Sequence, residues 1–158
     1  MIIKPLHQDM IGEVIDLLSQ GSPYIWPRTA SDYWLYSALF SSTCPVAPHE
    51  DTITGVVIAI RSQDHPDDIY IQDVMTHAHH RRQGIAKALI NSVCAQGEAW
   101  GCGRLYLTSE PENTSAHHAW GALGFVNVPG DHRVNGVEVI TDFKGPGKTR
   151  AVYELHLR

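Results

Sequence analysis

Residues 76–90, THAHHRRQGIAKALI, decide how the rest of the chain is interpreted. They follow a strand-like run and open a strongly periodic helical pattern, with a glycine at the helix entrance. The first turn of a helix presents unpaired N–H groups and about half a positive charge, which together favour bound anions. Gly84 and Ala86 are small enough for a phosphate to approach the backbone. Because Arg81 and Arg82 add fixed positive charge, the pattern predicts a phosphate site, with a solvated helix start as the alternative.

The composition is that of an ordinary globular protein. The chain has 158 residues, of which 43% are hydrophobic and 18% charged, so a single domain over residues 1–158 is expected. Its formal net charge of −5, counted with neutral histidines, argues against a nucleic-acid partner. Three cysteines without paired metal spacing predict a reducing, cytoplasmic compartment. No apolar run approaches the length of a membrane span, so neither a membrane segment nor a signal peptide is expected.

The first part of the chain predicts two helices joined by a loop that is rich in proline and aromatic residues. A short strand at residues 2–3 precedes a helix at residues 9–19. Residues 29–32 match a capping box for a second helix, with an expected apolar stripe of Trp34, Leu35, Ala38 and Leu39. Most aromatic side chains of this region fit a core. A loop of this kind also suits the wall of a pocket, for which the candidates are Tyr24, Trp26 and Tyr33.

The remaining pattern alternates strands with two further helices. Strands are expected at residues 43–47, 54–60, 69–75, 104–109, 125–128, 137–140 and 151–157. One helix runs from Gly84 to Gly101 or Gly103, and another follows Asn113. A hairpin or an acceptor-site loop is expected within residues 129–150. The order of elements predicts a mixed sheet with helices on both sides.

Two motifs together resemble the GNAT superfamily of acyl-CoA-dependent N-acyltransferases. Residues 81–86, RRQGIA, match the family's (Gln/Arg)-x-x-Gly-x-(Gly/Ala) pyrophosphate loop. Residues 113–116, NTSA, followed by Trp120 and Gly124-Phe125, resemble its Asn-x-x-Ala…Gly-Phe segment. A helix and a strand separate the two motifs, as the family requires, and the resemblance covers nearly the whole chain.

The resemblance implies a fold, an activity and a cofactor site. The fold is α+β in three layers: a mixed, mostly antiparallel seven-stranded sheet with helices on both faces and a splayed fourth and fifth strand. The activity is that of a single N-acetyltransferase domain, which transfers an acetyl group from acetyl-CoA, as co-substrate, to a primary amine of a small molecule, amino acid or peptide. Implied cofactor-binding residues are Val74, Met75 and Thr76 for the pantetheine arm, Arg81, Arg82, Gln83, Gly84, Ile85 and Ala86 for the pyrophosphate, and Asn113 and Trp120 on the following helix.

Direct attack of an amine on the thioester needs an oxyanion donor and a way to release the thiolate. A backbone N–H near Val74 or Met75 suits the oxyanion. Many relatives protonate the thiolate with a Tyr, where this chain has Trp120, which is a donor but no acid and also fits a core residue. A thiol with a pKa of about 8.5 is a good enough leaving group to depart as a thiolate without an acid. Alternative donors are His117, His118 and Tyr106.

Two carboxylates are candidate catalytic residues. Some relatives carry a Glu where this chain has Thr108, and Glu110 lies on the same strand face two residues later. Asp73 falls inside a strand that reads as buried, where a carboxylate is costly unless it has a partner. Asp73 therefore either anchors a structural network or faces the cleft.

The sequence does not identify the acceptor and leaves two rival functions open. Acidic residues Asp131, Glu138 and Asp142 suit a cationic acceptor, whereas Lys144, Lys148 and Arg150 suit an acceptor carboxylate. The histidines His77, His79 and His80 make metal binding a rival function, although no obvious tetrahedral set is present. The second rival is a non-catalytic acetyl-CoA sensor, and the family resemblance suggests a homodimer.

Overall fold

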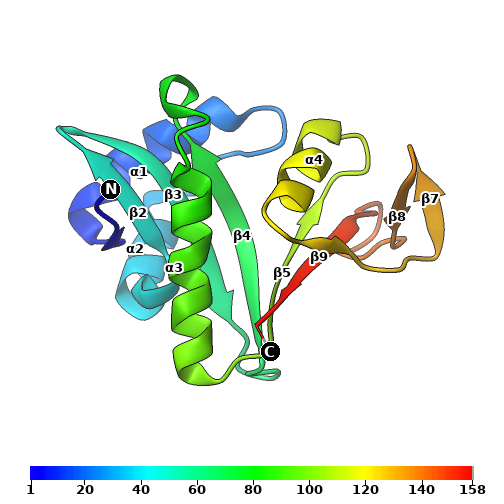
Figure 1. Cartoon of the computed structure of the whole chain (residues 1–158). Helices are drawn as coiled ribbons and strands as arrows, with labels where there is room; N and C mark the ends of the chain where they lie inside the picture. Colours follow the sequence, from blue (N-terminus) through cyan, green and yellow to red (C-terminus); the bar gives the residue numbers. More distant parts are fainter. Residues whose placement is uncertain (158) are drawn as a thin grey trace.

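A seven-stranded mixed sheet forms the centre of the molecule, with helices on both faces (Figure 1). The computed structural model describes residues 1–157, and the strand order is β1-β2-β3-β4-β5-β9-β6, with a separate β7-β8 hairpin. Neighbouring strands are antiparallel except for the parallel pair β4 and β5. This arrangement confirms the predicted fold class. The strands are β1 (Lys4–Pro5), β2 (Pro45–His49), β3 (Thr52–Arg61), β4 (Asp68–Thr76), β5 (Arg104–Ser109), β6 (Val126–Asn127), β7 (His132–Val134), β8 (Val137–Val139) and β9 (Ala151–His156).

The helices begin and end where local sequence signals place them. The capping box that starts the second helix is present: the Thr29 hydroxyl accepts from the Asp32 N–H, and the Asp32 carboxylate accepts from the Thr29 N–H. The third helix ends at Gly101, whose φ of 75° suits glycine. The α-helices are α1 (Ile11–Leu18), α2 (Ala30–Leu39), α3 (Ile85–Trp100) and α4 (Thr114–Ala122), and the 3₁₀ turns are η1 (Gln8–Met10), η2 (Ser19–Gly21), η3 (Ser41–Thr43) and η4 (Ala78–His80).

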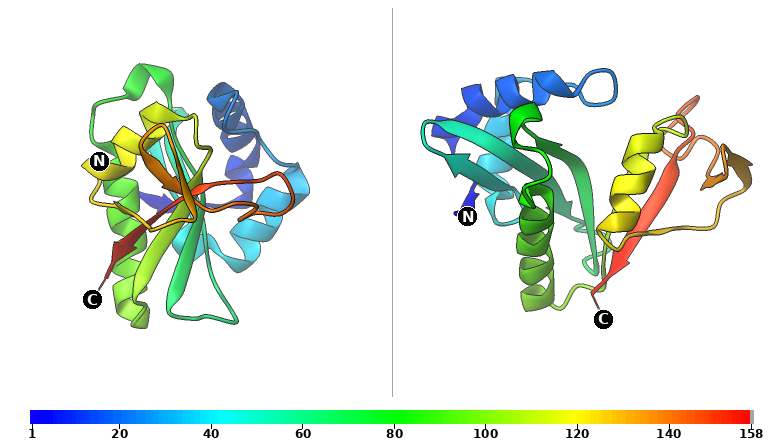
Figure 2. Two further views of the ribbon diagram at one scale, coloured as in Figure 1. Left: turned by 90° about the vertical axis from the view of Figure 1, so that its right-hand side faces the viewer. Right: turned by 45° about the horizontal axis from the view of Figure 1, so that its top comes forward.

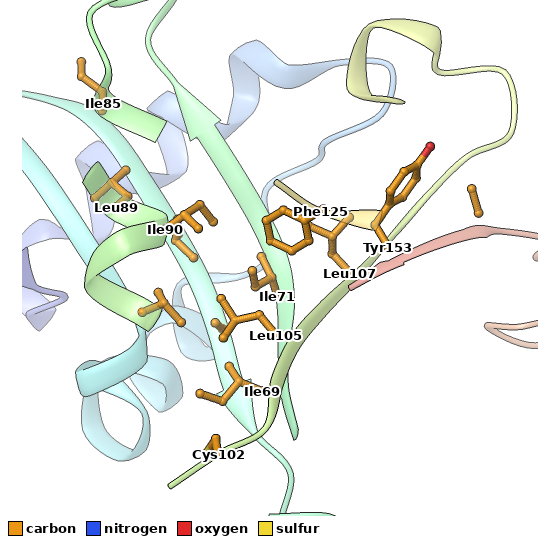
Figure 3. Packing of buried hydrophobic residues seen from close by; sticks show 14 of the residues in the cluster. Ile69, Ile71, Ile85, Leu89, Ile90, Cys102, Leu105, Leu107, Phe125 and Tyr153 are labelled. Carbon is orange, nitrogen blue, oxygen red and sulfur yellow. The ribbon is translucent and has the colours of Figure 1, made fainter. Parts of the chain in front are cut away.

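Each face of the sheet carries its own hydrophobic cluster. The cluster under α3 and α4 joins side chains of α3 to those of β4 and β5 (Figure 3), with Ile85, Leu89, Ile90, Ile69, Ile71, Leu105 and Leu107 among its members. The cluster under α1 and α2 includes Val14, Leu18, Tyr33, Val56, Ile58 and Met75. Close packing of this kind resists displacement, so the first turn of α3 is held firmly against the sheet.

The face of α2 that packs against the core is not the apolar stripe that the sequence predicts. Trp34, Leu35 and Leu39 are 52%, 38% and 67% exposed, whereas Tyr33 is fully buried. The Tyr33 hydroxyl accepts a hydrogen bond from the Arg28 N–H at 2.9 Å. Because this bond satisfies its polar end, the tyrosine ring takes the core position, and the predicted stripe is wrong.

The start of the chain and residues 129–150 refine the prediction in different ways. The first strand lies two residues later than expected: Ile2 is 65% exposed, and Lys4 pairs with Val46. The expected hairpin within residues 129–150 is present as β7-β8, and a bridge between Ile140 and Arg150 begins the return to β9. Among the helices of residues 1–157, none combines the length and the apolar character needed to cross a membrane.

β4 and β5 diverge along their length, as Figure 1 and the right-hand view of Figure 2 show. Their parallel pairing comprises three residue pairs and ends with Tyr70 and Tyr106. β4 continues to pair with β3 as far as Thr76, and β5 continues to pair with β9 as far as Ser109. Facing edges of the two strands are thus left with backbone groups that need partners from elsewhere. The predicted splayed pair is confirmed.

A register shift inside β4 turns Asp73 to the face opposite Ile71. In the pairing with β3, Asp73 lies opposite Ile58 and Ile71 lies opposite Ala59, so Gln72 is an extra residue in β4. Ile71 therefore packs in the cluster under α3, whereas Asp73 shares the α1–α2 face with Ile58.

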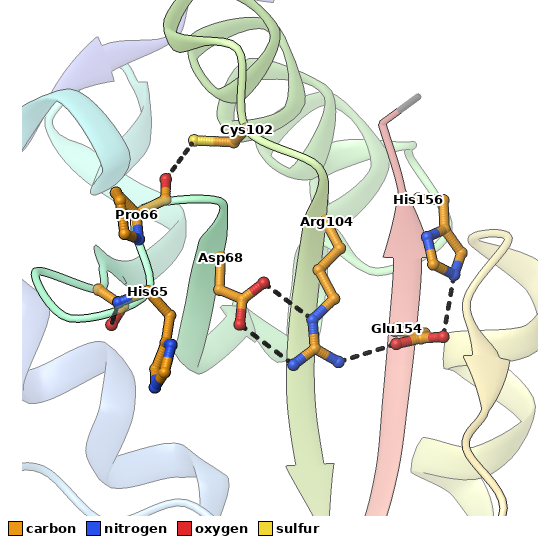
Figure 4. A network of polar contacts seen from close by, with 8 residues as sticks. His65, Pro66, Asp68, Cys102, Arg104, Glu154 and His156 are labelled. Atoms are coloured by element: carbon orange, nitrogen blue, oxygen red, sulfur yellow. Dashed lines mark hydrogen bonds and ion pairs between the residues drawn. The ribbon is translucent and has the colours of Figure 1, made fainter.

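A polar network ties the strands together at the end where they still pair (Figure 4). Arg104 of β5 binds both carboxylate oxygens of Asp68 on β4, at 3.0 and 3.2 Å, and reaches Glu154 on β9 at 2.8 Å. His156 lies 2.9 Å from the other oxygen of Glu154. Burial raises the pKa of Glu154, but the hydrogen bonds from Arg104 and His156 outweigh it and leave the pKa below its usual value. This network closes the narrow end of the split.

Candidate functional site

A cleft of about 720 Å³ occupies the region where β4 and β5 diverge. The end of β4, the first turn of α3, the end of β5, α4 and two loops line it, and its volume falls in the range of small-molecule sites, roughly 300–1,000 Å³. It brings together most of the residues that the sequence singled out, namely Tyr24, Asp73, Val74, Met75, Thr76, Arg81, Arg82, Gly84, Ile85, Ala86, Glu110, Asn113 and Trp120.

Three predicted residues lie elsewhere. Gln83 is exposed beside the helix entrance and does not line the cleft. Trp26 is 65% exposed, and its indole N–H donates to the Pro23 carbonyl at 2.9 Å. Tyr33 is part of the core under α2. Of the three aromatic residues proposed for the acceptor, the structure therefore places only Tyr24 at the cleft.

The entrance to α3 forms a cradle of the kind predicted for phosphates. Gly84 caps the helix in the left-handed region, with φ 79° and ψ 13°, and a Cβ added there would meet nothing within 4 Å. The first-turn N–H groups of Ile85, Ala86 and Lys87 precede the first intrahelical bond donor, Ala88, which binds the Gly84 carbonyl. Open space beside free donors at a helix N-terminus suits an anion.

A glycine in β3 allows this helix entrance to lie close to the sheet. A Cβ on Gly55 would lie 2.6 Å from Cγ2 of Ile85 and 2.9 Å from Cδ1 of Leu89. Gly55 also pairs with Thr76, the last residue of β4. It thereby sets the spacing between the unpaired strand edge and the helix entrance. The periodicity of the strand does not predict this role.

Trp120 both packs and lines the cleft. Its indole N–H donates to the hydroxyl of Ser109 at 2.8 Å, and its ring meets Phe125 edge-on at a centroid distance of 5.9 Å. Ser109 is only 4% exposed. Since this donor is already engaged, Trp120 is not available to protonate a leaving group. Asn113 caps α4, with its side-chain oxygen accepting from the Ala116 N–H at 3.3 Å.

The alternative proton donors do not line the cleft. The His117 ring lies between the Tyr153 hydroxyl, at 2.8 Å, and the Pro111 carbonyl, at 3.1 Å. A carbonyl only accepts, so Nε2 of the neutral ring carries the proton and Nδ1 accepts from Tyr153. His118 is exposed, and Tyr106 lies on the opposite face of the sheet from α3. The three side chains are therefore structural or solvent-facing.

Asp73 has the most unusual environment of the cleft. Its Oδ2 is a buried side-chain oxygen without a hydrogen-bond partner among residues 1–157. Burial raises the pKa of Asp73 to about 6, although the charges of Arg28 and Lys144 oppose the shift. A buried carboxylate oxygen without a partner is costly, and such groups gather at functional sites. The influence of Arg28 was not foreseen, because it comes from the loop before α2.

A second carboxylate shares the cleft with two cations. Glu110 follows β5, and its Oε1 lies 3.5 Å from Nη2 of Arg150. Lys144, on the loop before β9, lies 5.6 Å from the centre of the Tyr70 ring. Glu110, Lys144 and Arg150 all line the cleft. Acidic and basic groups thus meet in the cleft that Asp73 also lines.

The histidines next to the phosphate loop form an aromatic cluster. The ring of His77 lies 5.4 Å from those of His79 and His80, and His80 lies 5.7 Å from His49. Within residues 1–157, no group of three or more His, Cys, Asp or Glu side chains is arranged to hold a metal ion.

Comparison with known proteins agrees with the sequence motifs. Residues 11–125 match the model of the acetyltransferase (GNAT) family, whereas no curated protein matches the chain. The structure is similar to diaminobutyrate acetyltransferase EctA from Paenibacillus lautus, solved with L-2,4-diaminobutyric acid and coenzyme A (TM-score 0.77, 22% identity, 98% of this chain and 93% of that chain). It is also similar to the ribosomal-protein-S18-alanine N-acetyltransferase from Escherichia coli (0.73, 13%, 99% and 93%) and to Ard1 from Thermoplasma volcanium (0.76, 14%, 98% and 96%). At these identities the structural similarity shows the fold.

Proposed function

The chain belongs to the GNAT family of acetyltransferases, and from this premise we propose that it transfers the acetyl group of acetyl-CoA to a primary amine. The observation that carries the proposal is the position of the unpaired β4 edge next to the open entrance of α3. The Paenibacillus lautus relative was solved with coenzyme A and an amine-bearing amino acid, which supports both the co-substrate and an amine acceptor.

The residues of the cleft fit the parts of acetyl-CoA. We assign the pyrophosphate to the first-turn N–H groups of α3, with Arg81 and Arg82 supplying positive charge. Val74, Met75 and Thr76 offer a strand edge along which the pantetheine arm adds like an extra strand. These assignments place the thioester near the middle of the split, with a backbone N–H at Val74 or Met75 as the oxyanion donor.

We assign Asp73 as the general base. The acceptor amine attacks the thioester carbonyl carbon, its surplus proton passes to the Asp73 carboxylate, and the carbon–sulfur bond breaks with the electron pair leaving on the thiolate of CoA. The pKa of Asp73, raised by burial to about 6, keeps the carboxylate mostly ionised at pH 7 and makes it a better proton acceptor than an exposed aspartate. Glu110 is the weaker candidate, because the charge of Arg150 lies 3.5 Å from it.

The leaving thiolate needs no acid from Trp120 in this scheme. The Trp120 N–H is held by Ser109, and a thiol with a pKa of about 8.5 leaves as a thiolate near neutral pH. Trp120 instead forms part of the α4 wall.

A binding assay and a turnover assay together test the proposal. The protein is expected to bind acetyl-CoA in calorimetry and to release free CoA thiol when primary amines are supplied. Binding without release of CoA on any amine would favour the rival sensor function, and a protein that does not bind acetyl-CoA would contradict the proposal.

The variant Ala86→Glu tests the phosphate cradle. A glutamate in the first turn of α3 favours the helix, since its charge opposes the helix dipole, but it places a negative charge in the proposed pyrophosphate site. One unit charge about 5 Å from another interacts by about 3 kcal/mol at an effective dielectric constant of 20, so the Kd for acetyl-CoA should rise about 100-fold.

Ala95→Glu is the matched control, because Ala95 is exposed on the same helix and does not line the cleft. Gly84 is less suitable for this test, because any side chain is strained at its φ of 79°. Unchanged acetyl-CoA affinity in a folded Ala86→Glu protein would remove the cradle from the proposal.

A further inference from the structure

The side of the cleft that faces away from α3 and α4 carries charges of both signs. Leu105 and Leu107 of β5 point to the α3 cluster, so alternation along the strand directs Thr108 to the other face. Glu110 follows the end of β5 and lies 3.5 Å from Arg150. Asp73 reaches the same face as Thr108 through the register shift in β4. We call Asp73, Glu110, Lys144 and Arg150 the acceptor end of the cleft, because the proposed cofactor residues occupy the α3 side.

The guanidinium of Arg150 has donors to spare although its side chain is only 15% exposed. Nη1 donates to the carbonyl of Thr149 at 2.9 Å. Nη2 lies 3.5 Å from Glu110, which is longer than the roughly 2.7–2.9 Å of a charge-assisted hydrogen bond. A guanidinium presents five N–H donors in a planar fork. Arg150 is thus suited to bind a further carboxylate.

Lys144 adds a second positive charge to the acceptor end. It lies over the ring of Tyr70, 5.6 Å from the ring centre, and its charge acts on Asp73. A purely cationic acceptor, such as a polyamine, would be attracted by Asp73 and Glu110 but would bring no group that Lys144 and Arg150 can bind. The arrangement therefore favours an acceptor that brings its own negative charge.

We propose that the acceptor is a small amine that also carries a carboxylate, with the carboxylate bound by Arg150 and Lys144 and the amine directed to Asp73. This inference rests on the proposed acetyl transfer and specifies its substrate class as amino-acid-like. Tyr24, from the loop between α1 and α2, also lines the cleft and offers an aromatic surface for the body of the acceptor.

The test compares amino acids with their decarboxylated amines as acceptors. Lysine is paired with cadaverine, ornithine with putrescine, and phenylalanine with 2-phenylethylamine, and the release of CoA thiol gives kcat/KM for each. The amino acid of at least one pair should be preferred at least tenfold. In Arg150→Gln this preference should fall by roughly 10- to 100-fold, the range expected when a hydrogen bond to a charged group is lost.

Lys148→Gln is the matched control, since Lys148 lies on the same loop, is exposed and does not line the cleft. It should leave kcat/KM unchanged for both members of each pair. Turnover without preference for the amino acid, or an Arg150→Gln protein that loses activity on both members equally, overturns this inference but leaves acetyl transfer standing. No turnover on any member, by protein that binds acetyl-CoA and releases CoA with other amines, overturns this inference alone, whereas no turnover on any amine overturns both.

Discussion

Replacing Asp73 by asparagine should stabilise the protein while it removes activity. Burial raises the pKa of this carboxyl from its ordinary value of 3.8 to about 6, a difference of about two pH units. At 1.36 kcal/mol per unit, the ionised carboxylate lowers the free energy of unfolding by up to about 3 kcal/mol above pH 6. The neutral, isosteric asparagine avoids this penalty. The amide of the asparagine would not find all of its hydrogen-bond partners, which reduces the gain in stability by about 1 kcal/mol.

The sign of the pH dependence follows from the raised pKa. Below about pH 3, Asp73 is neutral in both the folded and the unfolded chain, so only the cost of the asparagine amide, about 1 kcal/mol, separates the two proteins in stability. As the pH rises from about 4 to 6, the unfolded state releases this proton before the folded state does, and the wild type loses stability relative to the variant. The difference in unfolding free energy should therefore change by about 2 kcal/mol across this window, approach its full value of about 3 kcal/mol near pH 7 and then stay level.

Chemical denaturation at pH 4.5, 6 and 8 measures this difference, and the change with pH is independent of the cost of the asparagine amide. At pH 8 the melting temperature of the variant should rise by about 2–8 °C, for a net gain of about 1–2 kcal/mol in a domain of this size. Asp51→Asn is the control, because Asp51 is exposed in the turn between β2 and β3. A stability difference that does not vary between pH 4.5 and 8 would refute the account of Asp73.

The activity of the same variant tests the assignment of the base. kcat/KM should fall by roughly 10²–10⁴-fold, the usual contribution of a general base. The decline of wild-type activity below a pH of about 6 should disappear in the residual activity of the variant. Full kcat/KM in folded Asp73→Asn would leave Asp73 as a structural residue only.

Two further substitutions separate structure from chemistry. Trp120→Phe removes the N–H that binds Ser109 and should lower the free energy of unfolding by about 1 kcal/mol, as measured by denaturation. The change in kcat should be less than tenfold. A 100-fold loss of kcat with intact acetyl-CoA binding would give this hydrogen bond a catalytic role. Arg104→Met leaves the carboxylates of Asp68 and Glu154 without their shared cation. Because partly buried charges then lack a counter-charge, the free energy of unfolding should fall by about 2–3 kcal/mol at pH 7. This second loss should shrink as the pH falls and both carboxylates become protonated, and a loss below about 0.5 kcal/mol at pH 7 would mean that the network behaves like an exposed ion pair.

The cofactor side of the site could be predicted from sequence because its determinants are local. The helix start at Gly84 and the cap at Asn113 depend on neighbouring residues, so their spacing predicts the fold and where the two helices begin; that the first of these entrances binds a phosphate stays a prediction. The exposure of Trp34 and Leu39 was not predictable in the same way. It depends on which residue of α2 can satisfy a buried polar group, and that is decided by a contact with Arg28 in the preceding loop.

The acceptor end depends on non-local features, which explains why the sequence left it open. Whether Asp73 faces the core or the cleft is decided by the extra residue Gln72, and a shift of one residue in a strand reverses the direction of every side chain beyond it. Regular alternation from Ile71 would place Asp73 under α3, among apolar side chains.

The same register shift decides which residues of β4 point to each face of the split sheet. Beyond it, Val74 contributes to the α3 face, where the proposed pyrophosphate loop lies, and Asp73 points to the opposite face, on the side proposed for the acceptor. Adjacent residues of one strand can therefore serve the donor and the acceptor of the acetyl group from opposite sides. Because the proposed donor side depends on backbone groups and the proposed acceptor side includes side chains from distant loops, we expect substitutions in those loops to alter the choice of acceptor without altering the affinity for acetyl-CoA.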